Sequence, residues 1–146
     1  MIGMRHECVG NGLAALSFNL QAASTLESIA SELRAWHNTG LRIAIWGGAG
    51  ESAAFLQTHG LDANRFPLVV DSDPASAGTS VPGTGQTIRS PNWLLENPVD
   101  IILIPCHWLA TEIVRQIDAA HIAYEGILIP REGRLVDFHA ADMILA

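Results

Sequence analysis

The sequence of 146 residues has little positive charge and no long apolar run. It carries 8 Lys and Arg against 15 Asp and Glu, for a net charge of −7. Because non-specific binding of DNA or RNA needs a basic surface, this balance argues against a nucleic-acid partner. No apolar run approaches the roughly 20 residues of a membrane helix. Residues 1–20 also lack the continuous apolar core of a secretory signal, so we expect a cytoplasmic protein without a membrane partner.

Cysteine is scarce and the histidines are scattered. The 2 cysteines, Cys8 and Cys106, belong to no paired motif, so we expect free thiols in a reducing compartment. The 6 histidines do not show the spacing of metal ligands, and no metal site is predicted.

Hydrophobic residues, by contrast, are abundant. They make up 49 % of the chain, enough for one core. We expect an N-terminal segment with a leading helix over residues 1–40, a nucleotide-binding domain over 41–139 and a tail over 140–146. The apolar fraction and the tryptophans favour an exposed apolar patch that meets another domain or a second copy, giving a homo-oligomer.

Helical and strand patterns alternate along the chain. We expect a helix over 22–36 capped by Ser24, a strand over 42–46, a helix over 51–59 and a strand over 66–70. An exposed loop over 72–87 follows, then a short strand at 87–88, a helix over 91–96 opened by Pro91 and a strand over 99–104. The last expected elements are a helix over 109–121, a strand over 126–129, an edge strand over 134–138 and a terminal turn or helix over 140–145. Such alternation gives right-handed crossovers and parallel strands. We therefore predict a three-layer Rossmann-like α/β fold: a mostly parallel sheet, the first strand central and helices on both faces.

The first strand and the following helix are joined by a glycine turn. Gly48, Gly50 and Ala53 fit the pattern G-x-G-x-x-A, and Asp71 ends the next strand 23 residues after Gly48. In dinucleotide-binding turns the first glycine permits a tight bend, the second lets a phosphate approach, and the small third residue lets helix and strand pack. Free amides at the helix start face the phosphate, and the acid accepts hydrogen bonds from ribose hydroxyls. Similar turns also serve packing alone, so an empty turn stays open.

The carboxyl ends of the strands define the candidate site, because ligands bind at that edge of an open α/β sheet. This rule brings residues 47–51, 71–73 and 105–108 around one cleft. The predicted binding residues are Gly47, Gly48, Ala49, Gly50, Glu51, Ser52, Asp71, Ser72, Asp73 and His107. We expect a nucleotide-type ligand, namely a nucleotide sugar, NAD or S-adenosylmethionine. We favour a buried, inert Cys106, prefer His107 for ligand contact, and assign no catalytic residue.

Residues 41–129 resemble the C-terminal domain of sugar C-methyltransferases, which use S-adenosylmethionine to methylate nucleotide-linked deoxysugars. The resemblance is carried by IAIWGGAGES, VVDSDPASAG, VPGTGQTIRSP, VDIILIP and LATEIVRQI. It implies a Rossmann-like unit that helps to enclose the nucleotide sugar, while a separate catalytic domain transfers the methyl group. The chain departs from the family at Ala77, where lysine is common, and places acidic Glu51 in the turn. We expect no methyl transfer by this chain alone.

Two alternatives remain. Asp71-Ser72-Asp73 after an apolar strand resembles the D-x-D opening of haloacid-dehalogenase-type phosphatases, in which one Asp is the nucleophile, the other a general acid, and both help hold magnesium. A small autonomous enzyme using Asp71, Asp73 and His107 is therefore one alternative. A structural or oligomerisation domain with an empty glycine turn is the other.

Overall fold

The computed structural model describes residues 25–140, so Cys8, Ser24 and nearly all of the expected terminal element lie outside the described residues. The elements are α2 (Thr25–Asn38), β1 (Ile43–Trp46), α3 (Glu51–Thr58), β2 (Leu68–Val70), η2 (Pro74–Ser76), β3 (Ile88–Arg89), α4 (Trp93–Glu96), β4 (Ile101–Leu103), η3 (His107–Leu109), α5 (Ala110–Ala119), β5 (Gly126–Arg131) and β6 (Arg134–Asp137). Within the described part of the chain, no helix combines the length and apolarity needed to cross a bilayer.

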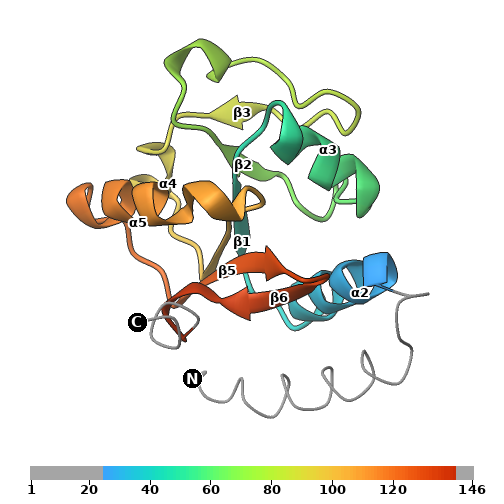
Figure 1. The fold of residues 1–146 in the computed structure, drawn as a ribbon. Helices are drawn as coiled ribbons and strands as arrows, with labels where there is room; N and C mark the ends of the chain where they lie inside the picture. The colour runs from blue at the N-terminus through green and yellow to red at the C-terminus, as the bar shows by residue number, and fades with distance from the viewer. Residues whose placement is uncertain (1–24, 141–146) are drawn as a thin grey trace.

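One six-stranded sheet organises the fold, in the order β3-β2-β1-β4-β5-β6 (Figure 1). Strands β3, β2, β1, β4 and β5 run parallel, and only β6 is antiparallel to its neighbour. Ile45 of β1 is in register with Val69 of β2 on one side and Leu103 of β4 on the other. The prediction of a mostly parallel sheet with the first strand inside it is confirmed.

Side chains of β1 alternate between two cores. Ile43 and Ile45 pack with residues of α2 and α3 on one face. Ala44 and Trp46 pack with residues of α4 and α5 on the other. In Figure 1, α4 and α5 lie to the left of β1, and α2 and α3 to its right. The three-layer prediction is confirmed, and α5 buries Ala110, Ile113, Val114 and Ile117 in the second of these cores.

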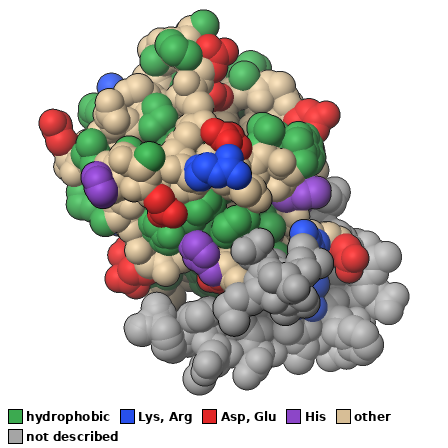
Figure 2. Space-filling model, turned by 60° about the vertical axis from the view of Figure 1, so that its left-hand side comes forward, with side chains coloured by type: hydrophobic (Ala, Val, Ile, Leu, Met, Phe, Trp, Pro, Cys, Tyr) green, Lys and Arg blue, Asp and Glu red, His purple; other side chains and the backbone are tan. Residues whose placement is uncertain are grey.

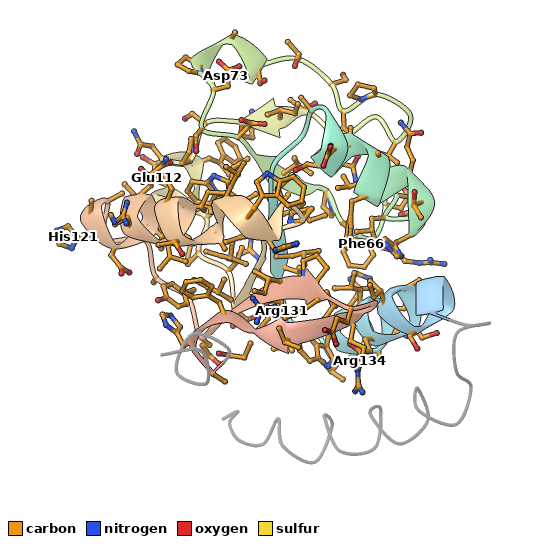
Figure 3. The ribbon with its side chains drawn as sticks, in the orientation of Figure 1. Phe66, Asp73, Glu112, His121, Arg131 and Arg134 are labelled. Carbon is orange, nitrogen blue, oxygen red and sulfur yellow. The ribbon has the colours of Figure 1, made fainter. Side chains whose placement is uncertain are left out.

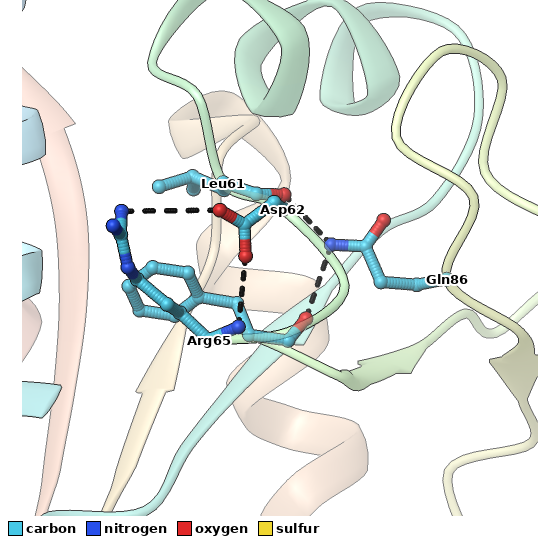
Figure 4. A network of polar contacts seen from close by, with 5 residues as sticks. Leu61, Asp62, Arg65 and Gln86 are labelled. Carbon is cyan, nitrogen blue, oxygen red and sulfur yellow. Dashed lines mark hydrogen bonds and ion pairs between the residues drawn. The ribbon is translucent and has the colours of Figure 1, made fainter.

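The loop predicted to be exposed over residues 72–87 is clamped at two points. Val81 and Gln86 are only 1 % and 2 % exposed. Nε2 of Gln86 donates to the carbonyls of Leu61 at 2.7 Å and Phe66 at 3.0 Å, so the loop is tied to the chain before β2 (Figure 4). Most of the loop is exposed, as predicted. Its two buried residues were not foreseen, because composition does not reveal which amide will satisfy buried carbonyls.

Several boundaries also differ from the prediction by a few residues. Helix α4 begins at Trp93, two residues after Pro91, and a 3-10 turn precedes α5. Strand β5 continues past Ile129 to Arg131 and pairs with β6. The turn between them has positive φ at Glu132 (53°) and Gly133 (78°), as two-residue hairpins require. The predicted edge strand is confirmed.

Candidate functional site

The glycine turn after β1 has two packed positions and one open position. Gly47 has φ +130°, and a Cβ there would collide with the side chain of Ser52. A Cβ at Gly48 would lie 2.6 Å from Cδ1 of Ile88. Gly50 has φ +59°, and a Cβ there would meet nothing within 4 Å. Packing thus explains the first two glycines, whereas Gly50 borders open space.

Free backbone donors gather at this turn. Within residues 25–140, the amides of Ala49, Gly50 and Glu51 donate no hydrogen bond. All three residues are exposed. The amides of Gly48 and Ser52 are already engaged, with Asp71 Oδ2 at 3.0 Å and Ala49 O at 3.2 Å. The available donors at the start of α3 are therefore three consecutive amides, which suits an anionic group.

Asp71 braces the glycine turn. Its Oδ2 accepts the amide of Gly48 at 3.0 Å, and its Oδ1 accepts the amide of Asp73 at 2.9 Å. A carboxylate has about four lone-pair sites, so Asp71 can still accept a ribose hydroxyl. The sequence pattern indicated a ligand-facing acid at this position but gave no sign that the acid also holds the turn.

Asp73 lies above the sheet, at the start of η2 (Figure 3). Its Oδ1 accepts the amide of Ala75 at 3.0 Å and caps this short helix. Pro74 occupies the first position of η2, where its missing N–H costs nothing. Asp73 therefore has a local turn-forming role, whether or not it also meets a ligand.

The side chain of Ser72 forms hydrogen bonds with a strand and with a helix. Its Oγ accepts Nε1 of Trp46 at 2.9 Å and donates to Oε1 of Gln116 at 2.6 Å. The chain of bonds joins β1, the segment after β2, and α5. Gln116 was missed at the sequence level because a glutamine within an amphipathic helix carries no positional signal.

A second link crosses from α3 to the end of β4. Oγ of Ser52 lies 3.3 Å from Sγ of Cys106, and the two residues are 5 % and 9 % exposed. Cys106 is a free, buried thiol, as predicted. Its neighbour His107 is exposed and makes an edge contact with Trp108, with ring centroids 5.1 Å apart.

The sheet edge thus brings most of the predicted residues together. The glycine turn is bonded to Asp71 on one side and to the amide of Ser52 on the other. Ser72, next to Asp71 in the chain, is bonded to Trp46 and Gln116 instead. Among the described residues, no hydrogen bond connects His107 with Asp71 or Asp73. The part of the chain that the structure describes contains no group of three or more metal-ligating side chains suited to an ion.

Three large apolar side chains of η3 and α4 are exposed to solvent. Trp108 and Leu109 of η3 are 58 % and 48 % exposed, and Leu95 of α4 is 50 % exposed. Seen from the side that Figure 1 has on its left, hydrophobic side chains are interspersed with charged ones (Figure 2). These residues are candidates for contact with another protein domain.

The sheet order and the glycine turn after β1 define a Rossmann-like α/β domain. Residues 13–130 match the family model of the C-methyltransferase C-terminal domain, so the chain belongs to this family. The resemblance noted from the sequence motifs is thereby confirmed. No match to a curated protein was found.

Proposed function

We propose that this domain binds a nucleotide-type ligand, preferably a nucleotide sugar, at the carboxyl edge of its sheet. The domain works with a separate methyltransferase catalytic domain and does not transfer a methyl group alone. NAD and S-adenosylmethionine are the competing ligands. Family membership supports the association with a catalytic domain, because the family is that of a C-terminal domain.

One observation carries the binding proposal. The amides of Ala49, Gly50 and Glu51 are exposed and lack an acceptor among the described residues, and Gly50 borders open space. Asp71 holds this turn in place through Gly48. Donors that are fixed before binding lose little entropy when a phosphate or ribose arrives.

The rival enzyme hypothesis is supported less well. It needs Asp71 and Asp73 as nucleophile and acid, yet both carboxylates accept backbone amides that shape the turn. His107 is exposed, its ring contact is with Trp108, and no hydrogen bond among the described residues joins it to either acid. The structural rival, an empty turn, predicts no ligand at all.

The exposed apolar residues Trp108 and Leu109 support a contact with the catalytic domain. Association in trans would be measured by adding a family catalytic domain to the wild type and to Trp108→Ser/Leu109→Ser. Light scattering of the chain alone reports whether a second copy occupies the surface instead.

The binding test is calorimetry with UDP- and dTDP-sugars, NAD and S-adenosylmethionine. We expect a nucleotide sugar to bind the wild type, and Asp71→Asn to weaken it by about tenfold or more, as for a lost hydrogen bond to a charged group. Asp62→Asn is the matched control, because Asp62 also accepts a backbone amide, that of Arg65 at 2.8 Å, in the turn before β2 (Figure 4). Equal loss in both variants, or no binding to the wild type, would reject the proposal. Incorporation of radiolabelled methyl groups by the chain alone would reject its non-catalytic part.

A further inference from the structure

The guanidinium of Arg89 lies over the indole ring of Trp93. Its Cζ is 4.2 Å from the ring centroid, within the range of a cation–π contact. No other arginine within residues 25–140 lies over an aromatic ring. Arg89 is exposed, and among the described residues no hydrogen bond or ion pair engages its guanidinium. The side of the guanidinium that faces away from Trp93 is therefore available to another planar group.

Arg89 belongs to the carboxyl edge of the sheet. It ends β3 and is in register with Val70, the last residue of β2. Its carbonyl accepts the amide of Asp71 at 3.0 Å, and Oδ2 of Asp71 accepts the amide of Gly48 at 3.0 Å. Two hydrogen bonds thus connect Arg89, through Asp71, to the glycine turn.

The position of the Arg89 side chain is set by the strand and by α4. Ile88 is buried in the core shared with α2 and α3, so the next side chain of β3 points to the opposite face of the sheet. Trp93, the first residue of α4, packs against the core on that opposite face. The guanidinium is therefore held over the indole before a ligand arrives, which lowers the entropic cost of binding.

The order of the strands matches the order of the groups in a nucleotide. The free amides follow β1, Asp71 follows β2, and Arg89 ends β3, and these strands are neighbours in that order (Figure 1). A phosphate at the amides and a ribose at Asp71 direct the base toward β3. Two strand spacings separate β1 from β3, which is about 10 Å. An extended nucleotide bridges such a separation.

We infer that Arg89, held by Trp93, stacks on the base of the bound nucleotide. The inference rests on the proposed nucleotide site and assigns the contact for the base of its ligand. Guanidinium groups stack on aromatic faces, and stacking of this kind is worth about tenfold in affinity per base. Because every base has a π-face, the contact accepts adenine and uracil alike.

Three probes test the inference: AMP, UMP and ribose 5-phosphate, the last of which has the phosphate and the ribose but no base. Their affinities are measured by NMR titration. We expect Arg89→Gln to weaken AMP and UMP about tenfold and ribose 5-phosphate by less than about threefold. Arg89→Lys should weaken AMP and UMP nearly as much, because lysine keeps the charge without a planar face. Arg115→Gln is the matched control: it removes the same charge from an exposed guanidinium, paired with Glu112, and should change each affinity by less than about twofold.

The Nε–Hε signal of Arg89 gives a direct readout. In the wild type it should shift on addition of AMP or UMP and stay in place with ribose 5-phosphate, because only the base has a ring current. An equal shift with all three probes would assign the guanidinium to the phosphate and overturn the inference. This measurement needs no substituted protein. The substitutions are nevertheless expected to fold, since the bond between Asp71 and Arg89 uses the Arg89 carbonyl and not its side chain.

The outcomes separate this inference from the proposed function. AMP binding that depends on Asp71 but is unchanged in Arg89→Gln overturns the inference and leaves the nucleotide site standing. Full affinity in Arg89→Lys with loss in Arg89→Gln reduces Arg89 to a charge contact and also overturns the inference. AMP binding that depends on Arg89 but is unchanged in Asp71→Asn supports the inference and rejects the proposed placement at the glycine turn. If a nucleotide sugar binds the wild type and the three probes do not, the inference alone falls; if nothing binds, both fall.

Discussion

The carboxylate of Asp71 accepts the backbone amide of Gly48 at 3.0 Å across 23 residues of sequence. The bond joins the end of β2 to the turn after β1, at the position where open α/β sheets bind their ligands. The second carboxylate oxygen of Asp71 accepts the amide of Asp73. One side chain therefore holds both backbone segments that border the proposed site, so we expect its loss to lower stability.

Asp71→Asn should lower the free energy of unfolding by about 1–3 kcal/mol, because the new side-chain NH2 faces an amide donor that it cannot satisfy. Chemical denaturation measures the change. Asp62→Asn, in the half-exposed turn before β2, should cost less. A larger loss in the control would show that Asp71 does not brace the glycine turn.

Gly48→Ala should destabilise the protein by about 1–3 kcal/mol, because its Cβ would overlap the side chain of Ile88 in a packed core. Ile88→Ala removes the overlapping atoms, so the double variant should be more stable than the sum of the two single changes predicts. Gly50→Ala is the comparison: its cost comes from φ +59° in open space and should not depend on Ile88. Additive energies for Gly48 and Ile88 would rule out the contact.

Gln86→Leu should cost about 2–4 kcal/mol, because it leaves the buried carbonyls of Leu61 and Phe66 without a donor. Gln57→Leu provides the matched control, since Gln57 donates from an exposed position to a single carbonyl, that of Pro82. Hydrogen exchange should also increase across residues 78–88 in the first variant. Equal destabilisation by both changes would mean that Gln86 does not clamp the loop.

Burial raises the pKa of Glu32 above its ordinary value of 4.5, and the nearby charge of Arg134 lowers it only in part. A carboxyl group with a raised pKa in the folded state binds its proton more tightly there than in the unfolded chain. The ionised form therefore opposes folding, and this cost grows as pH rises from 4.5 through the raised pKa.

Glu32→Gln should consequently be more stable than the wild type at neutral pH, and the difference should vanish below about pH 4. Denaturation curves at a series of pH values measure it. An advantage of the variant that is independent of pH would assign the effect to packing and not to ionisation.

The fold was predictable because its signals are local and repeated. Alternating apolar strands and helices gave the parallel sheet, and Gly48 with Asp71 indicated which edge holds the site. Long-range polar contacts were not predictable. Neither Gln86 nor Gln116 stands out in sequence, since their partners are set by the final packing of a loop and a helix.

The same limit explains what was missed in the candidate site. The pattern predicted that Asp71 faces a ligand but could not indicate that both of its oxygens accept backbone amides. The strand was also expected to end at residue 129, whereas β5 continues to Arg131 through its pairing with β6, which depends on the register of the hairpin.

The sheet order has a consequence for how the chain can be divided. Strands β1, β2 and β3 form one half of the sheet, β4, β5 and β6 the other, and each half is continuous in sequence. Within the sheet, the halves pair only through β1 and β4, and both hydrophobic cores contain residues of both halves. Exposed Pro98 lies between them. Co-expressed fragments split there should therefore reassemble, which would make the domain a split reporter whose reconstitution depends on the same strand pair that carries the glycine turn.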